Sequence, residues 1–294
     1  MSHMETTTLI SKPKSNSRAV KFLKKCTKSP QLMVGASIVL FFVLIAIFAP
    51  LIAPHDPLEQ SIARRFQGFS SAHWLGTDNL GRDMLSRLIF GARVSLTVGL
   101  SATAMGASVG IVLGLISGYY GGKVDTVIMR FVDILLAFPG LLLALGIVAA
   151  LGQSTFNVIL AMSVFGVPTF ARIVRGSTLG IVKLEYIDAV RAIGAGDLRI
   201  IFLHILPNIV SPIIVQATLG IGGVIAGSAT LAFLGVGTPP PTPDWGIMLS
   251  QGRESLQLYP RLVMLPGLAI FSIVIGINLF GNGLRDVLQP KKLS

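Results

Sequence analysis

Charged residues and glycines gather in one stretch of the chain, residues 185–208, which lies between long apolar runs. It reads EYIDAVRAIGAGDLRIIFLHILPN. Its charged positions first recur every three residues, at Glu185, Asp188 and Arg191. The apolar positions do the same, at Ile187, Val190 and Ile193. This pattern predicts a short amphipathic helix whose charged side is a surface for pressing against another protein, and it offers no catalytic centre.

The second half of the stretch predicts a turn and another helix. Gly194 follows the first helix directly, and a glycine in that place supplies the left-handed conformation that reverses a chain. We expect Asp197 to cap a second helix over Leu198 to Leu206, and Pro207 to kink or break that helix. The alternative is a solvated loop that only joins two neighbouring helices. Such a loop would need no glycine turn and could be shorter.

The elements that position this stretch are apolar. The chain has 294 residues, of which 52% are hydrophobic and 13% charged, and its mean hydropathy is +0.75. Because a bilayer core needs about 20 apolar residues as a helix, we searched for long runs without Asp, Glu, Lys or Arg. Six runs emerge, at Leu32 to Ala53, Val94 to Tyr119, Ile134 to Leu151, Thr155 to Ala171, Ile209 to Val236 and Leu262 to Leu284. They predict an all-α polytopic membrane protein with six transmembrane helices.

Basic residues predict the orientation. Most of the 24 lysine and arginine residues fall on the side of the membrane that holds the N-terminus, which favours cytoplasmic N- and C-termini. The net charge of +11 therefore needs no nucleic acid as a partner. Four segments follow: a basic cytoplasmic arm (1–30), a first transmembrane helix with an outer interfacial segment (31–93), a five-helix permease core (94–284) that includes the 185–208 loop, and a cytoplasmic tail (285–294).

Several chemistries are excluded. A phosphate-binding loop needs GxxxxGK before Ser or Thr, but Gly122-Lys123 is followed by Val124 and has Ser117 where the first glycine belongs. Charged residues fall at predicted helix ends or in loops, with Asp133 at the start of the third run, so a proton relay inside the membrane is not expected. The chain's energy must come from a partner or from the solute gradient. His55, His73 and His204 are far apart in sequence, so we expect no metal site.

The 185–208 stretch resembles the EAA loop of binding-protein-dependent ABC importer permeases. The likeness rests on Asp188-Ala189-Val190, on Gly194 six residues after the acid, and on Leu206-Pro207. Asp replaces the usual Glu, Val190 replaces the second Ala, and His204 stands at an apolar position of the pattern. In that family the loop is a coupling helix that sits in a groove on an ATPase subunit. The resemblance implies a coupling role for Glu185, Asp188, Ala189, Arg191, Gly194, Ala195 and Pro207.

Three further segments resemble the second of the two dissimilar permeases in peptide and nickel importers. They are HWLGTDNLGRDMLSRLIFGARVSL (73–96), FLGVGTPPPTPDWGIML (233–249) and GNGLRDVLQP (281–290). The resemblance implies a type I ABC importer permease fold and transport of dipeptides or oligopeptides, with nickel or glutathione as alternatives. In the first segment, Thr77 and Asp78 can cap a turn, and an interfacial helix from Met84 is expected to lead into the second span.

The partners implied by the resemblance are a second homologous permease, two ABC ATPase subunits, an extracytoplasmic solute-binding protein, a peptide substrate and the lipid bilayer. ATP and magnesium would be bound by the ATPases, so this chain is expected to hold no cofactor and no catalytic residue. The expected location is the bacterial inner membrane. From the residues alone two other classes stay open: a channel that conducts without ATPases, and a receptor or assembly scaffold without solute flux.

Overall fold

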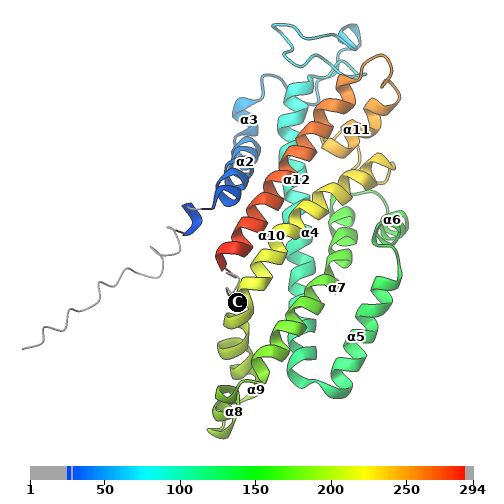
Figure 1. Ribbon diagram of the computed structural model, residues 1–294. Coiled ribbons are helices and arrows are strands. Elements are labelled where there is room, and N and C mark those ends of the chain that lie inside the picture. The colour runs from blue at the N-terminus through cyan, green and yellow to red at the C-terminus, as the bar shows by residue number, and fades with distance from the viewer. Residues whose placement is uncertain (1–24, 28, 289–294) are drawn as a thin grey trace, which may run out of the picture.

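The computed structural model describes residues 25–27 and 29–288, and this part of the chain is mostly helical (Figure 1). The predicted basic arm lies almost wholly outside these residues, as does most of the predicted tail. Within the described residues no strand forms, and a single isolated bridge joins Thr77 to Asp83. The predicted all-α fold is confirmed.

Five long apolar helical segments can each cross a membrane: α2 (Pro30–Ile47), α4 (Met84–Tyr120), α7 (Thr155–Val182), the segment Asp197–Phe233 and α12 (Arg261–Leu288). A sixth span is bent. Its two halves, α5 (Gly122–Ala137) and α6 (Gly140–Leu151), meet at 86°. The six predicted spans are therefore present when this pair counts as one. Short elements complete the chain: α3 (Ala49–Ile52), η1 (Ile62–Arg64), α8 (Glu185–Ala192) and α11 (Trp245–Arg253).

The helix after the first connecting loop differs from the prediction. Met84 begins no separate interfacial helix, because α4 runs from this residue to Tyr120 without a break. At 1.5 Å per residue it is about 55 Å long, so its ends extend past a bilayer core of about 30 Å. The carboxylate of Asp83 caps α4 by accepting the Ser86 backbone N–H at 2.8 Å.

The third span also differs. The run from Ile134 to Leu151 is not one straight helix, since Pro139 stands at the bend between α5 and α6. Asp133 lies well inside α5 and caps no helix, which corrects its expected place. Arg172 likewise lies inside α7, and its guanidinium contacts the Asp133 carboxylate at 2.7 Å. The expectation that charges occur only at helix ends is therefore wrong, because these helices carry paired charges along their length.

Helix α4 packs closely on α7. This packing holds together the two helices that lead into the bent span and into the 185–208 segment. Four glycines of α4, Gly106, Gly110, Gly114 and Gly118, recur every four residues and face α7. A Cβ atom on Gly114 would lie 2.6 Å from the Ala171 carbonyl oxygen, closer than a carbon atom can approach. The absence of side chains lets the two backbones meet, as small residues do in membrane helix pairs. This stripe packs within the chain.

We expect Gly114→Ala to destabilise the helix pair, since the added methyl group must push α7 away. Overpacking of this kind costs about 1–3 kcal/mol, and the fixed position of the Ala171 carbonyl favours the upper part of that range. Thermal unfolding of the purified chain in detergent measures the loss. Gly176→Ala on α7 is the matched control, because its Cβ would meet no atom within 4 Å. Equal melting temperatures for the two variants would contradict the packing argument.

Candidate functional site

The 185–208 segment occupies one tip of the bundle, where α8 is set across the ends of the longer helices (Figure 1). Helix α8 ends in a glycine turn, as predicted. Gly194 has φ +86°, its N–H donates to the Arg191 carbonyl at 2.9 Å, and the Ala195 N–H donates to the Val190 carbonyl at 3.3 Å. These two bonds form the Schellman motif, which satisfies the last carbonyls of a helix.

The apolar side of α8 is only partly as predicted. Ile187 is fully buried and Val190 packs beside it, but Ile193 is 84% exposed. A helix turns about 100° per residue, so a three-residue spacing falls about 60° short of a turn at each step. Ile193 therefore points about 120° away from Ile187, and the helix ends before this residue.

The second helix begins earlier and continues further than predicted. Gly196 is its N-cap, and Asp197 is the first helical residue, with its carboxylate accepting the Tyr119 hydroxyl at 2.7 Å. Helix α9 (Asp197–Arg199) continues through the π-helix η2 (Ile200–Ile205) into α10 (Leu206–Phe233). Pro207 does not end the helix. The wider π turn precedes this proline. The side-chain amide of Asn208 donates to the His204 carbonyl at 2.6 Å.

Most of the predicted site residues are exposed at this tip: Glu185, Asp188, Ala189, Arg191, Gly194 and Pro207. Ala195 is half-buried against the segment's own core. Asp188 and Arg191 lie 3.3 Å apart, with 72% and 41% of their side chains exposed. An ion pair this exposed contributes at most about 1 kcal/mol, so both charges are available to a partner.

Two exposed apolar residues at the tip were missed. Ile193 and Leu198 flank the glycine turn and are 84% and 69% exposed. Together with Asp188 and Arg191 they form a surface that we call the tip surface. Large apolar side chains that stand open beside charges are typical of protein-binding sites. Both residues lie at helix ends, where the periodic spacing of apolar residues no longer predicts which side chains are buried. This position was the signal in the sequence.

A buried cluster joins the tip surface to the spans. Ile187, Ile200 and Ile205 are fully buried and pack against Leu115 of α4 and Val174 of α7. The guanidinium of Arg191 also lies 5.4 Å from the centre of the Tyr119 ring. These contacts connect α8 to the ends of α4, α7 and α10.

At the opposite end of the bundle a buried charge cluster holds the loop before α4. The Asp78 carboxylate accepts from Arg82 Nε at 2.7 Å and also binds the Arg87 guanidinium. Both arginines donate to the Gln251 side chain of α11, at 2.9 and 3.2 Å. The predicted turn is confirmed here, with Gly76 and Gly81 at positive φ.

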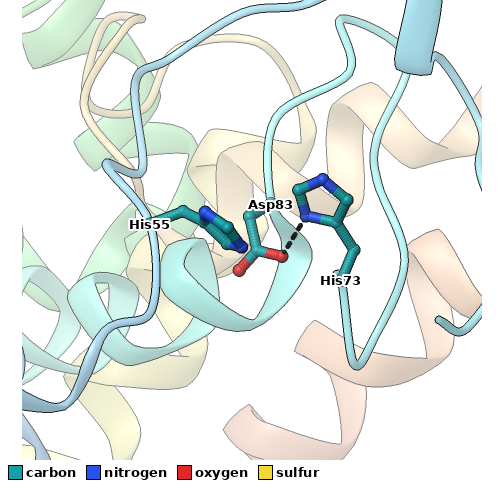
Figure 2. Close-up of side chains that lie close together, drawn as sticks. All are labelled: His55, His73 and Asp83. Carbon is teal, nitrogen blue, oxygen red and sulfur yellow. Dashed lines mark hydrogen bonds and ion pairs between the residues drawn. The ribbon is translucent and has the colours of Figure 1, made fainter. Parts of the chain in front are cut away.

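The histidine prediction needs a correction at this end. His55 and His73 are distant in sequence, but their rings lie 4.7 Å apart, next to Asp83 (Figure 2). Ligand atoms of the three residues lie within 4.8 Å of one another. Each carboxylate oxygen of Asp83 already has a partner, His73 Nδ1 at 2.9 Å and the backbone N–H and hydroxyl of Ser86 at 2.8 Å. These bonds serve to fix the start of α4.

Asp244 and Trp245 attach α11 to this end. Burial raises the pKa of the Asp244 carboxyl, while the Ile247 and Gly246 backbone N–H groups that it caps oppose the rise. Trp245 is 1% exposed, and its indole N–H donates to the Leu88 carbonyl at 2.9 Å. The tryptophan therefore ties α11 to α4.

The fold defines a class, that of a multi-pass helical membrane protein. The model of the family "Binding-protein-dependent transport system inner membrane component" matches residues 110–294. Residues 19–68 match "N-terminal TM domain of oligopeptide transport permease C". The chain belongs to the binding-protein-dependent transport permeases of the inner membrane.

Curated relatives agree over most of the chain. It is 47% identical to "Dipeptide transport system permease protein DppC" of Alkalihalophilus pseudofirmus, over 92% of this chain and 89% of that protein. It is 46% identical to "Glutathione transport system permease protein GsiD" of Pectobacterium atrosepticum, over 86% and 84%. The family resemblance drawn from the three segments is thereby confirmed.

Solved structures confirm the fold. The inward-facing MetNI methionine ABC transporter matches with a TM-score of 0.57 at 20% identity, over 69% of this chain and 97% of that chain. An amino acid ABC transporter solved with histidines matches with a TM-score of 0.53 at 15% identity, over 67% and 92%. The predicted type I ABC importer permease fold is therefore present.

Proposed function

We propose that this chain is one of two permease subunits in an ATP-driven importer of short peptides, and that the tip surface is where an ATPase subunit docks. The observation that carries the proposal is the join between an exposed binding surface and the spans. Asp188, Arg191 and Ile193 are open to a partner, while Ile187, next to Asp188 in sequence, is fully buried in the cluster shared with α4 and α7.

In this mechanism two ABC ATPase subunits bind ATP and magnesium, and the bound ATP closes the pair. The groove that holds α8 then moves, and the rigid 185–208 segment passes this movement to α4, α7 and α10. The spans exchange an inward-facing for an outward-facing arrangement, which accepts solute from an extracytoplasmic binding protein. Coupling requires that the two arrangements bind the tip surface with different free energies. Glu185, Ala189, Gly194, Ala195 and Pro207 shape this surface and its support.

The orientation follows from the same docking. ATPases that use cytoplasmic ATP must meet the tip surface on the cytoplasmic side, which places the Asp78 cluster outside. Helix α2 then begins in the cytoplasm and α12 ends there. A basic arm on that side suits the anionic headgroups of the inner leaflet.

Short peptides are the substrate class that the relatives favour. One relative is named for dipeptides and another for glutathione, which is itself a tripeptide. Nickel is the weaker alternative, because His55 and His73 are engaged in fixing the loop before α4 and offer no path across the membrane.

The experiment is purification of the tagged chain from gently solubilised native membranes, followed by reconstitution into liposomes. We expect a second permease and two ATPases to co-purify, and uptake of radiolabelled dialanine to require ATP and the binding protein. If the chain came down alone and conducted dialanine without ATP, the protein would be a channel. If it came down with partners but gave no flux of any solute, a scaffold role would replace the importer.

A further inference from the structure

We infer that one exposed stripe of α7 lines the route of the peptide, and that Asp133 and Arg172 on this route receive the peptide's charged ends. The inference rests on the proposed function and adds the residues that contact the peptide. Its starting point is an ion pair between two membrane-spanning segments that stands open to its surroundings.

The stripe consists of Phe165, Thr169, Arg172 and Gly176, all exposed. They are four, seven and eleven residues apart, and such spacings return to one face of an α-helix. The opposite face of α7, which includes Ala171 and Val174, is packed on the glycines of α4. The stripe is thus the side of α7 turned away from α4, and it mixes an aromatic ring, a hydroxyl and a charge.

Two adjoining hollows lie at the N-terminal end of the stripe, next to Phe165. One has about 230 Å³ between α7 and α10, with Thr169 and Gln216 in its wall. The other has about 370 Å³ and reaches Gly140 at the bend of the third span. Met162, Phe165 and Gly223 line both. The volumes fall near the lower end of the range for small-molecule sites, and the walls are mostly apolar with a few polar groups.

The Asp133–Arg172 pair lies further toward the C-terminal end of α7, where Arg172 belongs to the same stripe. Arg172 is seven residues from Phe165, or about 10 Å along the helix. The two charged side chains are 49% and 55% exposed and meet at 2.7 Å. Charged side chains that face lipid are costly, so a pair this open must face water or another protein. A pathway shared with a second permease provides such surroundings.

A neighbouring pair shows what a purely structural contact looks like here. Arg175 holds Asp125 with two bonds, of 2.5 and 2.6 Å, and the Ser117 hydroxyl donates to the same carboxylate. The side chains of Arg175 and Asp125 are 34% and 19% exposed. By contrast Asp133 and Arg172 share a single contact. So exposed a pair contributes little to stability, and it opens readily to exchange partners.

A short peptide with free ends has the chemistry to make that exchange. Its carboxylate matches the planar fork of Arg172, which binds carboxylates through two parallel hydrogen bonds. Its ammonium group replaces the arginine at Asp133. Both charges stay paired while the peptide is bound, and they pair with each other once it leaves. The side chains of the peptide then occupy the apolar hollows beside Phe165. Recognition of both ends explains how one route serves peptides of differing side chains.

The test uses the complete importer in nanodiscs without its binding protein, and measures equilibrium binding of dialanine, N-acetyl-dialanine and dialanine amide. The wild type should bind dialanine at least about tenfold more tightly than either blocked form, the loss typical of one charge-assisted hydrogen bond. Arg172→Gln should remove the preference over the amide and keep the other. Asp133→Asn should do the reverse. Arg130→Gln, which neutralises another exposed charge of α5, is the control and should change neither preference.

A double neutral variant separates a binding role from a structural one. In Asp133→Asn/Arg172→Gln neither side chain is charged, but a hydrogen bond can still join α5 to α7, so a merely structural contact should leave both end preferences at the wild-type value. If the pair binds the peptide's ends, assembly should be kept while both preferences for free ends disappear. Retention of both preferences in this variant, or no detectable dialanine binding to the wild type, would overturn the inference. The proposed function is tested separately by ATP-driven uptake, which can succeed while the end preferences fail.

Discussion

Replacing Gly194 with tryptophan should uncouple the importer: ATP-driven uptake falls by more than about tenfold, while the chain still inserts and pairs with its second permease. Two effects act together. A residue other than glycine at φ +86° is strained by about 1–2 kcal/mol, and an indole in the middle of the tip surface displaces the ATPase. No atom lies within 4 Å of the position where the Cβ would be, so the substitution leaves the core of the chain intact. Dialanine uptake and ATP hydrolysis in proteoliposomes measure the result.

The chain offers a matched control for this substitution. Gly152 has φ +88°, has no atom within 4 Å of its Cβ position, and lies between α6 and α7, away from the tip surface. Gly152→Trp should therefore carry the same backbone strain and transport normally. Asp188→Lys is a second route to the same effect, through charge. Normal uptake by Gly194→Trp in an intact assembly would show that the tip surface does not couple transport to ATP.

The spans were predictable because apolar length is a local property. The run from Leu32 to Ala53 corresponds to α2 and α3, and the run from Leu262 to Leu284 to α12. The third span was not, since Pro139 marks an interruption of the apolar run but does not give the size of the bend, which is 86°. A helix that changes direction inside the bundle is set by its neighbours, above all by Phe165, which the Cβ of a residue at Gly140 would strike.

The candidate site likewise has a part that was predictable from the sequence and a part that was not. The turn at Gly194 was predictable, because a left-handed residue after a helix selects glycine. The ion pairs were not, because Asp133 and Arg172 are 39 residues apart, and Asp125 and Arg175 are 50 apart. Before the fold brings them together, each is an isolated charge near the end of an apolar run. His55 and His73 pose the same problem: distance in sequence says nothing about distance across a loop that folds back on itself.

Asp78→Asn should destabilise the chain more than any surface change at the same end. Arg82 and Arg87 are each 1% exposed, and Asp78 is the acid that contacts both. An amide carries no charge and cannot accept all the bonds that the carboxylate does, from both guanidinium groups and from the Leu80 and Arg82 N–H groups. Loss of one partner of a buried ion cluster costs about 3–5 kcal/mol, because charges stay buried without compensation.

Few other hydrogen bonds of the two arginines could compensate for the loss of the Asp78 carboxylate. The Nε atom of Arg87 already lacks a hydrogen-bond partner, and the one remaining contact of both arginines is the Gln251 side chain. We therefore expect a lower melting temperature in detergent, lower abundance in the membrane, and separation of α11 from the start of α4. Glu59→Gln, an exposed acid in the same loop, is the control and should melt like the wild type. If Asp78→Asn melted with it, solvent would have to reach the two arginines in the folded protein.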